Sequence, residues 1–503
     1  MTTVPHPHPR PLSRPALSRP VVHAPLFRLD GPRILFLTLV VAAAIAVVAV
    51  RPAMRYVLAP MLATLLMLCG YLVAIYRQDK TLPVFEASTY WMLAATLYGA
   101  FPLLNFIAGG LRWYPLSDSR LVMLDPGPVE VGTMGWRYVV HIASFLAVYL
   151  AMRRPVKMPP MQPPGRSRIA AIVIGLIAST AIIVAVGQIF GVTYFASYKD
   201  LVKGTVKGYA DVSSLPVLQV VHNLVGMRML LIQATIGILL LSWRKLSSKV
   251  ILGGFFLFLG SMTVALGTAR SDFVLMLMTA IMLYHRIVKP IRFIIAIPAG
   301  IFFICGFLFM GIMRDMQGVH TISVEYETPV LASMNEFQVV FATAYDLQQM
   351  RDSGELEAIG IPWQLPFCDF YFLIPSQLLP FQKIDPSGWY LYIRGIEGVG
   401  LMFGVVAQAA VGWGWLELIL RAVGVALFCA FLQRWYAKHV RGFWPTIFLA
   451  FMCMWMYYSL RQSSFSFMYF IVYRFMPAFL AVETVAWVLR DGRRRLLKGR
   501  RTS

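Results

Sequence analysis

Residues 413–433 read WGWLELILRAVGVALFCAFLQ, and this stretch decides the class of fold. Its only charged residues are Glu417 and Arg421. At about 1.5 Å per residue, a helix of this length is about 30 Å long, which matches the hydrocarbon core of a bilayer. The stretch therefore predicts a helix that spans a membrane.

Similar apolar runs recur along the chain and predict about twelve membrane-spanning helices in all. The chain is 58% hydrophobic, against about 45–50% for a soluble domain. The runs are continuous and do not alternate, which favours helices over a β-barrel. The fold predicted is an all-α polytopic membrane helix bundle, with spans at residues 34–50, 53–76, 89–109, 136–152, 169–190, 216–242, 250–266, 273–285, 292–313, 413–433, 443–460 and 466–488.

The net charge of +22 follows the pattern of a membrane protein. About 28 of the 45 Lys and Arg lie in the two tails and in alternate short loops. By the positive-inside rule, this distribution predicts an inner-membrane protein with both termini in the cytoplasm. No stacking-and-basic module points to nucleic acid. The five cysteines form no CxxC pair, so neither a metal site nor a disulfide framework is expected.

Five regions are expected along the chain. Loop 314–396 stands out because it carries ten of the 23 acidic residues. The Gly-rich stretch 398–412 is read as re-entrant, because a full crossing would place the following basic loop outside. The predicted regions are a disordered basic cytoplasmic tail (1–32), transmembrane helices one to nine (33–313), one large periplasmic loop (314–396), a re-entrant segment with helices ten to twelve (397–489) and a basic cytoplasmic tail (490–503).

Arginines at the outer membrane boundary are the first candidates for function. A guanidinium can bind phosphate oxygens with two parallel hydrogen bonds. The alternative for any one of them is contact with lipid headgroups. The four candidates for binding a lipid-linked diphosphate are Arg270, Arg314, Arg394 and Arg461. Three further arginines lie inside apolar spans and need partners there: Arg228, Arg421 and Arg474.

Three residues of the predicted outer loop are candidates for acid–base catalysis. An unperturbed histidine has a pKa near neutrality, so His320 is the first of them, with Glu336 and Asp346 as alternatives. The chain has no HExxH, no GxSxG and no phosphate-binding GKS/T loop. An enzyme with this sequence would not use a cytoplasmic nucleotide donor. Its donor would already be in the membrane.

The stretch 371–434 resembles the bacterial oligosaccharide repeat-unit polymerases, the O-antigen polymerase family (Wzy-type). These typically show an IP…P-K stretch, a Gly-rich turn, a helix of small and acidic residues, an aromatic-Gly-x-x-Gly break and a long apolar helix. The matching positions here are Ile374, Pro375, Pro380, Lys383, Gly398, Gly400, Gly404, Gly412 and Gly414. The segment GTARSDF at 267–273 is similar to a second family step. One departure is Gln408, where members often carry a Glu, which leaves Glu397 or Glu417 as substitutes.

The resemblance implies a GT-C-like glycosyltransferase that takes a glycan from undecaprenyl diphosphate and transfers it to another lipid-linked unit. It implies that the boundary arginines stabilise the diphosphate, without a metal or other cofactor. An optional general base would come from His320, Glu336, Asp272 or Glu397, and sugars would lie against Trp363, Trp389 and Tyr390. The lipid bilayer, a flippase and a chain-length regulator are the expected partners.

Four other classes remain open. A polysaccharide ligase would share the architecture. A membrane acyltransferase would need a His in or near the membrane. A transporter or flippase predicts polar residues on helices in both halves of the bundle. A non-catalytic export subunit would have no need of four arginines at one boundary.

Overall fold

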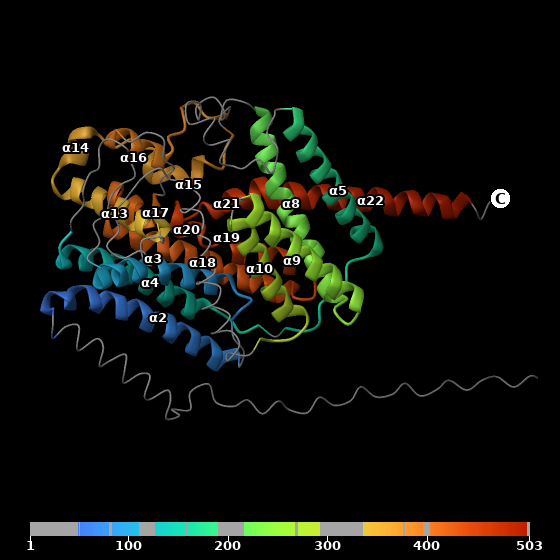
Figure 1. Cartoon of the computed structure of the whole chain (residues 1–503), viewed down its shortest axis with the longest axis horizontal. Coiled ribbons are helices and arrows are strands. Elements are labelled where there is room, and N and C mark those ends of the chain that lie inside the picture. Colours follow the sequence, from blue (N-terminus) through green and yellow to red (C-terminus); the bar gives the residue numbers. More distant parts are fainter. Residues whose placement is uncertain are drawn as a thin grey trace, which may run out of the picture. The chain divides into compact units, whose positions relative to one another are not determined.

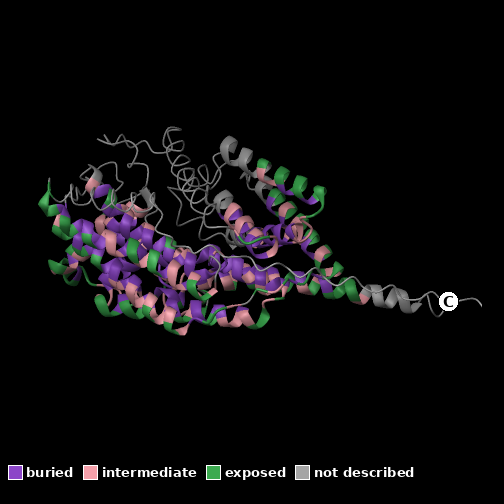
Figure 2. Ribbon diagram, turned by 90° about the horizontal axis from the view of Figure 1, so that it is seen from below, coloured by how far each residue is buried: buried purple, intermediate pink, exposed green. Residues whose placement is uncertain are grey.

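The computed structural model describes Ala49 and residues 51–79, 83–109, 126–156, 158–189, 216–266, 270–291, 335–375, 378–395 and 403–499. Every regular element in these ranges is a helix. Burial is concentrated where the helices pack on one another, and exposed residues lie on their outward sides (Figure 2). The described part therefore confirms the predicted all-helical class.

Within the described ranges, seven stretches of helix are long and apolar enough to cross a membrane. Each coincides with a span predicted from the sequence, so the membrane character of the chain rests on both observations. The helices concerned are α2 (Arg55–Asp79, after the short η1, Pro52–Met54), α3 (Ala87–Gly109), α4 (Pro128–Met152), α5 (Arg166–Ile189), α18 (Trp415–His439), α19 (Phe443–Trp455) with α20 (Tyr458–Arg461), and α21 (Phe467–Phe470) continued by the π-helical η4 (Ile471–Phe475) and α22 (Met476–Gly499).

Three further predicted spans are also helices, namely α8 (Pro216–Leu241), α9 (Leu246–Leu266) and α10 (Arg270–Ile287). Within the described part of the chain, the apolar stretches of these three helices are only 10–17 residues long. The predicted spans 34–50 and 292–313 lie outside the described residues, except for Ala49. The total of twelve spans therefore stays a prediction.

Helix α4 occupies the centre of one group of helices and packs against α2, α3 and α18 (Figure 1). Its side of the core is aromatic, with Trp91 of α3 stacked on Phe145 at 3.8 Å between ring centroids. His141 joins α4 to α18 through a hydrogen bond of 2.9 Å between Nδ1 and the Leu418 carbonyl oxygen. A second group consists of α5, α8 and α22, with α10 against α8.

The helices of the predicted outer loop, together with α17 from the predicted re-entrant stretch, form a packed layer at one end of the bundle, where α3 ends and where α4 and α18 begin (Figure 1). We call this the loop end. Its longest helix, α13, packs against α3 and α17. The layer comprises α13 (Asn335–Asp352), α14 (Glu355–Ile359), η2 (Leu365–Phe367), α15 (Cys368–Tyr371), α16 (Pro386–Arg394) and α17 (Gly404–Val411).

The apolar residues of 332–350 recur at the spacing of an amphipathic helix, and α13 has the corresponding apolar face. Val340, Phe341 and Ala344 are fully buried. The Phe337 ring packs edge-on against Tyr98 of α3 at 4.8 Å between centroids. The loop is therefore folded onto the bundle by an apolar helix face, as the spacing of its apolar residues predicts.

Helix α17 lies within the stretch predicted to be re-entrant. All eight of its residues are buried. At about 1.5 Å per residue it is about 12 Å long, well short of the hydrocarbon thickness. The chain then turns through Gly412 and Gly414 into α18, and Gly414 has a φ of 64°, which favours glycine.

A buried ion cluster joins α2, α3 and α4 at the end opposite the loop end. Arg153, just after α4, pairs with Asp79 at the end of α2 and with Glu86 just before α3. Tyr149 also donates to Glu86 Oε2 at 2.8 Å. Three helix ends are thereby fixed together by one guanidinium, since each buried charge needs its partner.

Replacing Arg153 with Met is expected to destabilise the protein by about 3–5 kcal/mol, because the buried Glu86 and the partly buried Asp79 would lose their partner. The check is the thermal unfolding midpoint of purified protein in detergent. Arg154→Met is the matched control, since Arg154 is the next residue and is exposed. Equal midpoints for the two variants would contradict the structural role of the cluster.

Candidate functional site

A charged cluster lies at the beginning of α18, and Arg421 is its centre. The guanidinium donates from Nε to Glu417 Oε1 at 2.6 Å and from Nη2 to the Pro366 carbonyl oxygen at 2.5 Å. Nη1 pairs with Asp369 of α15. All three charged residues are buried. The helix spacing of four residues places Glu417 one turn before Arg421, so the pair forms locally.

Asp369 connects this arginine to two other segments. Its Oδ1 accepts the backbone N–H of Phe465 at 2.8 Å. Its Oδ2 accepts from Gln408 Nε2 of α17 at 3.2 Å. The Asp369 carboxylate thus links α15, α17, α18 and the turn before α21. The resemblance leads one to expect an acid at position 408, and here Gln408 donates to an acid.

A small cavity opens beside the cluster. It has a volume of about 200 Å³ and is lined by Pro366, Phe367, Phe370, Trp413, Glu417, Leu420, Arg421 and Phe465. Its walls are mostly aromatic, and its charged members are one carboxylate and one guanidinium. Phe370 and Trp413 are 60% and 59% exposed, so the rim is open to the surroundings. Aromatic walls with a few fixed polar groups are typical of ligand sites.

The turn between α17 and α18 fixes the position of Glu417. Its Oε2 accepts the backbone N–H of Trp413 at 2.8 Å. A Cβ on Gly412 would overlap this carboxylate, so any other residue there would displace Glu417. Arg351 of α13 donates from Nη1 to the carbonyl oxygens of Ala410 and Gly412, both at 2.8 Å. These are carbonyls at a helix C-terminus, where a cation is favourable.

A second charged cluster joins α13 to α16. Arg394 donates from Nε to Asp346 Oδ2 at 2.7 Å and from Nη2 to Oδ1 at 2.5 Å. Tyr390 donates to Asp346 Oδ2 at 2.7 Å. Burial and the neighbouring Asp346 raise the pKa of the Tyr390 hydroxyl, so it stays protonated. Burial alone would lower the pKa of Arg394, but Asp346 raises it.

The four predicted diphosphate-binding arginines differ in their positions. Arg394 is paired with Asp346 and, at 3.3 Å, with Glu355. The Arg461 guanidinium lies 5.3 Å from the centre of the Tyr458 ring in α20. Arg270 begins α10, and its side chain lies outside the described part, as does all of Arg314. Convergence of the four stays a prediction.

The predicted general bases fall almost wholly outside the described residues. His320 and Glu397 belong to ranges that the structure does not describe. Asp272 lies in the first turn of α10 and Glu336 in the first turn of α13, without described side chains. Among the described acids, Glu417, the substitute considered for the family's Glu, faces a cavity.

The three aromatic residues predicted to bind sugar differ in their solvent exposure. Trp363 is 60% exposed and packs edge-on against Phe381. Trp389 and Tyr390 are buried in α16, and the Tyr390 hydroxyl is bonded to Asp346. A buried ring offers no stacking face, so exposed Trp413 and Phe370 at the cavity rim are better placed for a sugar than these two.

An aromatic cluster of α19–α21 lies between two arginines. Trp455 stacks on Phe470 at 4.0 Å, and Tyr458 meets Phe470 edge-on at 4.7 Å. Arg461 lies over Tyr458, and Arg474 lies 4.5 Å from the Phe470 centroid. Arg474 belongs to the π-helical turn η4, a distortion that often marks functional sites. These contacts explain how Arg474 is accommodated in an apolar span.

Cys368 is excluded as a thiolate nucleophile at neutral pH. Burial, and secondarily the neighbouring Asp369, raise the pKa of its thiol well above the usual value. Within the described residues, no group of three or more His, Cys, Asp and Glu side chains could hold a metal ion.

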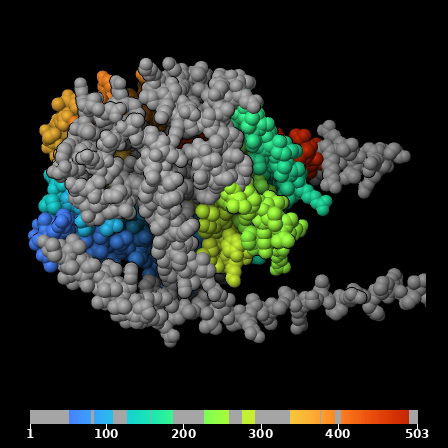
Figure 3. All heavy atoms as spheres, viewed as in Figure 1, coloured from blue at the N-terminus to red at the C-terminus, as the bar shows by residue number. Residues whose placement is uncertain are grey.

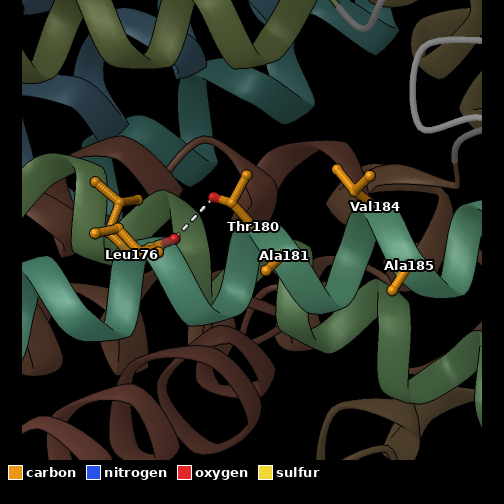
Figure 4. A pocket seen from close by; sticks show the side chains of 6 residues that line it. Leu176, Thr180, Ala181, Val184 and Ala185 are labelled. Carbon is orange, nitrogen blue, oxygen red and sulfur yellow. Dashed lines mark hydrogen bonds between the residues drawn. The ribbon is translucent and has the colours of Figure 1, made fainter.

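A larger groove, of about 550 Å³, runs along α5 (Figure 4). Its described lining is Leu176, Ile177, Thr180, Ala181, Val184 and Ala185, and the Thr180 hydroxyl donates to the Leu176 carbonyl oxygen at 2.8 Å. Helix α5 lies at the surface in Figure 3, with Ile177 64% exposed. An uncharged lining of this kind suits lipid tails and offers no group for catalysis.

Sequence reasoning missed three of the residues that build the site. Arg351 and Asp369 gave no local signal, since their partners lie more than fifty residues away. Arg137 could have been found from the sequence, because it is a charged residue inside the predicted span 136–152. Its guanidinium lies 4.5 Å from the centroid of the Trp415 ring, in the first turn of α18.

Comparisons of the chain with models of known protein families, with curated proteins and with solved structures gave no match. The class of protein therefore rests on the fold and the site. Both define a helical membrane protein with a carboxylate–guanidinium pair in an aromatic cavity at the loop end.

Replacing Gly412 with Ala is expected to displace Glu417 and lower the free energy of unfolding by about 1–3 kcal/mol, as overpacking does. Gly70→Ala is the control, because a Cβ there would meet no atom within 4 Å. Thermal unfolding in detergent compares the two. Tolerance of both changes alike would show that the Glu417 carboxylate does not sit against Gly412.

Proposed function

We propose that the chain polymerises undecaprenyl-diphosphate-linked oligosaccharide repeat units into a surface polysaccharide or exopolysaccharide. It acts as a lipid-linked-donor glycosyltransferase at the periplasmic face of the bacterial inner membrane. The observation that supports this most is the aromatic cavity beside Glu417 and Arg421, at the start of an apolar helix and beneath a folded loop layer. Such a position is within reach of a substrate whose lipid lies in the membrane and whose glycan lies outside it.

The reaction needs a base and positive charge from the protein. The acceptor hydroxyl oxygen forms a bond to the anomeric carbon of the donor sugar, and the bond from that carbon to the diphosphate oxygen breaks. Undecaprenyl diphosphate leaves with the bonding electrons, and the hydroxyl proton passes to a base. Glu417 is proposed as that base, and arginines stabilise the charge on the leaving diphosphate. The boundary arginines Arg270, Arg314 and Arg461 remain part of this proposal.

The orientation of the bundle is also part of the proposal. Basic residues Arg286 and Arg434 lie at the end opposite the loop end, where they bond the Val440 and Met152 carbonyl oxygens. Under the positive-inside rule this end is cytoplasmic, which places the loop end in the periplasm. Both termini are then cytoplasmic, and twelve spans in a GT-C-like arrangement complete the architecture.

A strain lacking the gene tests the reaction, with its polysaccharide separated by gel electrophoresis. The expected result is single repeat units on the acceptor and no long chains, restored by the wild-type gene. Unchanged long chains in a strain without a second polymerase would overturn the proposal. Loss of single units as well would favour a ligase or a flippase.

Within that strain, Glu417→Gln tests the base. The variant keeps the shape of the side chain and is expected to shorten or abolish the polymer while the protein still reaches the membrane.

Trp413→Ala tests the cavity wall and is expected to lower polymer yield by up to about tenfold, since aromatic stacking contributes about 0.5–1.5 kcal/mol. Trp487→Ala is the matched control, with Trp487 56% exposed on α22 against 59% for Trp413. Membrane levels are checked by immunoblot. If both Trp variants support normal chains, the cavity is not where the glycan binds.

A further inference from the structure

Arg137 of α4 is a buried cation with unused hydrogen-bond donors. Only 6% of the residue is exposed. Its Nε and Nη1 atoms are buried and bond to nothing in the described part of the chain. A guanidinium stays charged at any physiological pH, so it cannot escape the cost of burial by losing its proton. Donors left unpaired in this way mark a place where an acceptor from outside the chain would bind.

The surroundings of Arg137 supply further positive charge. The guanidinium lies over the Trp415 ring at 4.5 Å. Gly414 precedes Trp415 in the chain, and Arg351 Nη1 lies 3.6 Å from where a Cβ on Gly414 would be. Two guanidinium groups, from α4 and α13, therefore meet the first turn of α18. That turn is the N-terminal end of a 25-residue helix, where the helix dipole favours an anion.

The nearby acids do not cancel this charge. Glu417 lies in the same turn, but its carboxylate is taken by the Trp413 N–H and by Arg421. Asp352 is near enough to interact electrostatically with Arg137, as is Arg351. The Asp352 carboxylate is bonded to Gln348 Nε2 at 2.6 Å. Arg137, Arg351 and Asp352 together therefore keep one net positive charge beside the first turn of α18.

We infer that Arg137, Arg351 and the first turn of α18 form an oxyanion site for the phosphate group of a membrane lipid. A guanidinium matches two phosphate oxygens at once. Trp136 and Trp415, next to this site, are 43% and 41% exposed. Half-exposed tryptophans are typical of the membrane interface, so the site lies at the depth of the lipid headgroups. The site does not depend on the proposed polymerase activity.

Two lipids carry this chemistry, an anionic phospholipid of the bulk membrane and the diphosphate of a prenyl carrier. The test distinguishes them. Purified full-length protein in zwitterionic nanodiscs is titrated with phosphatidylglycerol in one arm and with farnesyl diphosphate in the other. Bound lipid is counted by native mass spectrometry.

The variant is Arg137→Gln, and the control is Arg77→Gln, which removes the same charge from an exposed position at the end of α2. Arg137→Lys keeps the charge without the bidentate geometry. Unfolding midpoints confirm that each variant is folded.

The expected result is about tenfold weaker binding for Arg137→Gln, partial recovery for Arg137→Lys and no change for Arg77→Gln. Loss confined to farnesyl diphosphate identifies the prenyl carrier, and loss confined to phosphatidylglycerol, or shared by both lipids, identifies a general phospholipid site. Unchanged binding of both lipids in Arg137→Gln would overturn the inference, and so would an equal loss in Arg77→Gln. This experiment measures lipid binding and not polymer synthesis, so a negative result here would overturn the lipid site without bearing on the proposed polymerase activity.

Discussion

The ion contacts of Arg421 hold the loop end of the bundle together. Apolar surroundings make a lone guanidinium costly, so this residue can exist within α18 only if the chain brings acceptors to it. Glu417 comes from the preceding turn, whereas Asp369 and the Pro366 carbonyl come from the loop layer. Because the buried Arg421 needs the Asp369 carboxylate as its partner, α15 must lie against α18.

The same constraint governs the short helix α17. A helix of eight buried residues leaves carbonyl groups at its C-terminus that no water reaches. Arg351 supplies their donors from α13, and the apolar face of α13 holds that arginine in place. The loop layer is therefore part of the membrane bundle's own hydrogen-bond network. A loop with this role has to be folded.

Local sequence carried the information about helices, because an apolar run specifies a span without reference to the rest of the chain. The spans at 136–152 and 413–433, for example, are α4 and α18 in the structure. The site was less predictable. The ion pair of Asp369 with Arg421 and that of Asp346 with Arg394 join residues about fifty positions apart. Periodicity contains nothing about such contacts, so the pairing partners appear only once the loop layer is folded.

The arginines at the loop end differ in which groups accept hydrogen bonds from their guanidinium N–H donors. Arg394 and Arg421 bond carboxylates of the chain, and Arg351 bonds backbone carbonyls, so each is needed for the fold. Arg137 is buried to a similar degree, yet its Nε and Nη1 have no acceptor within the described residues. Sequence position does not separate them, since it places Arg394 at the boundary and Arg421 inside a span and singles out neither Arg351 nor Arg137. The hydrogen-bond partners do separate them. A guanidinium already holding a carboxylate must give up that bond before it can hold a phosphate, and within the described residues Arg137 has no such bond to lose.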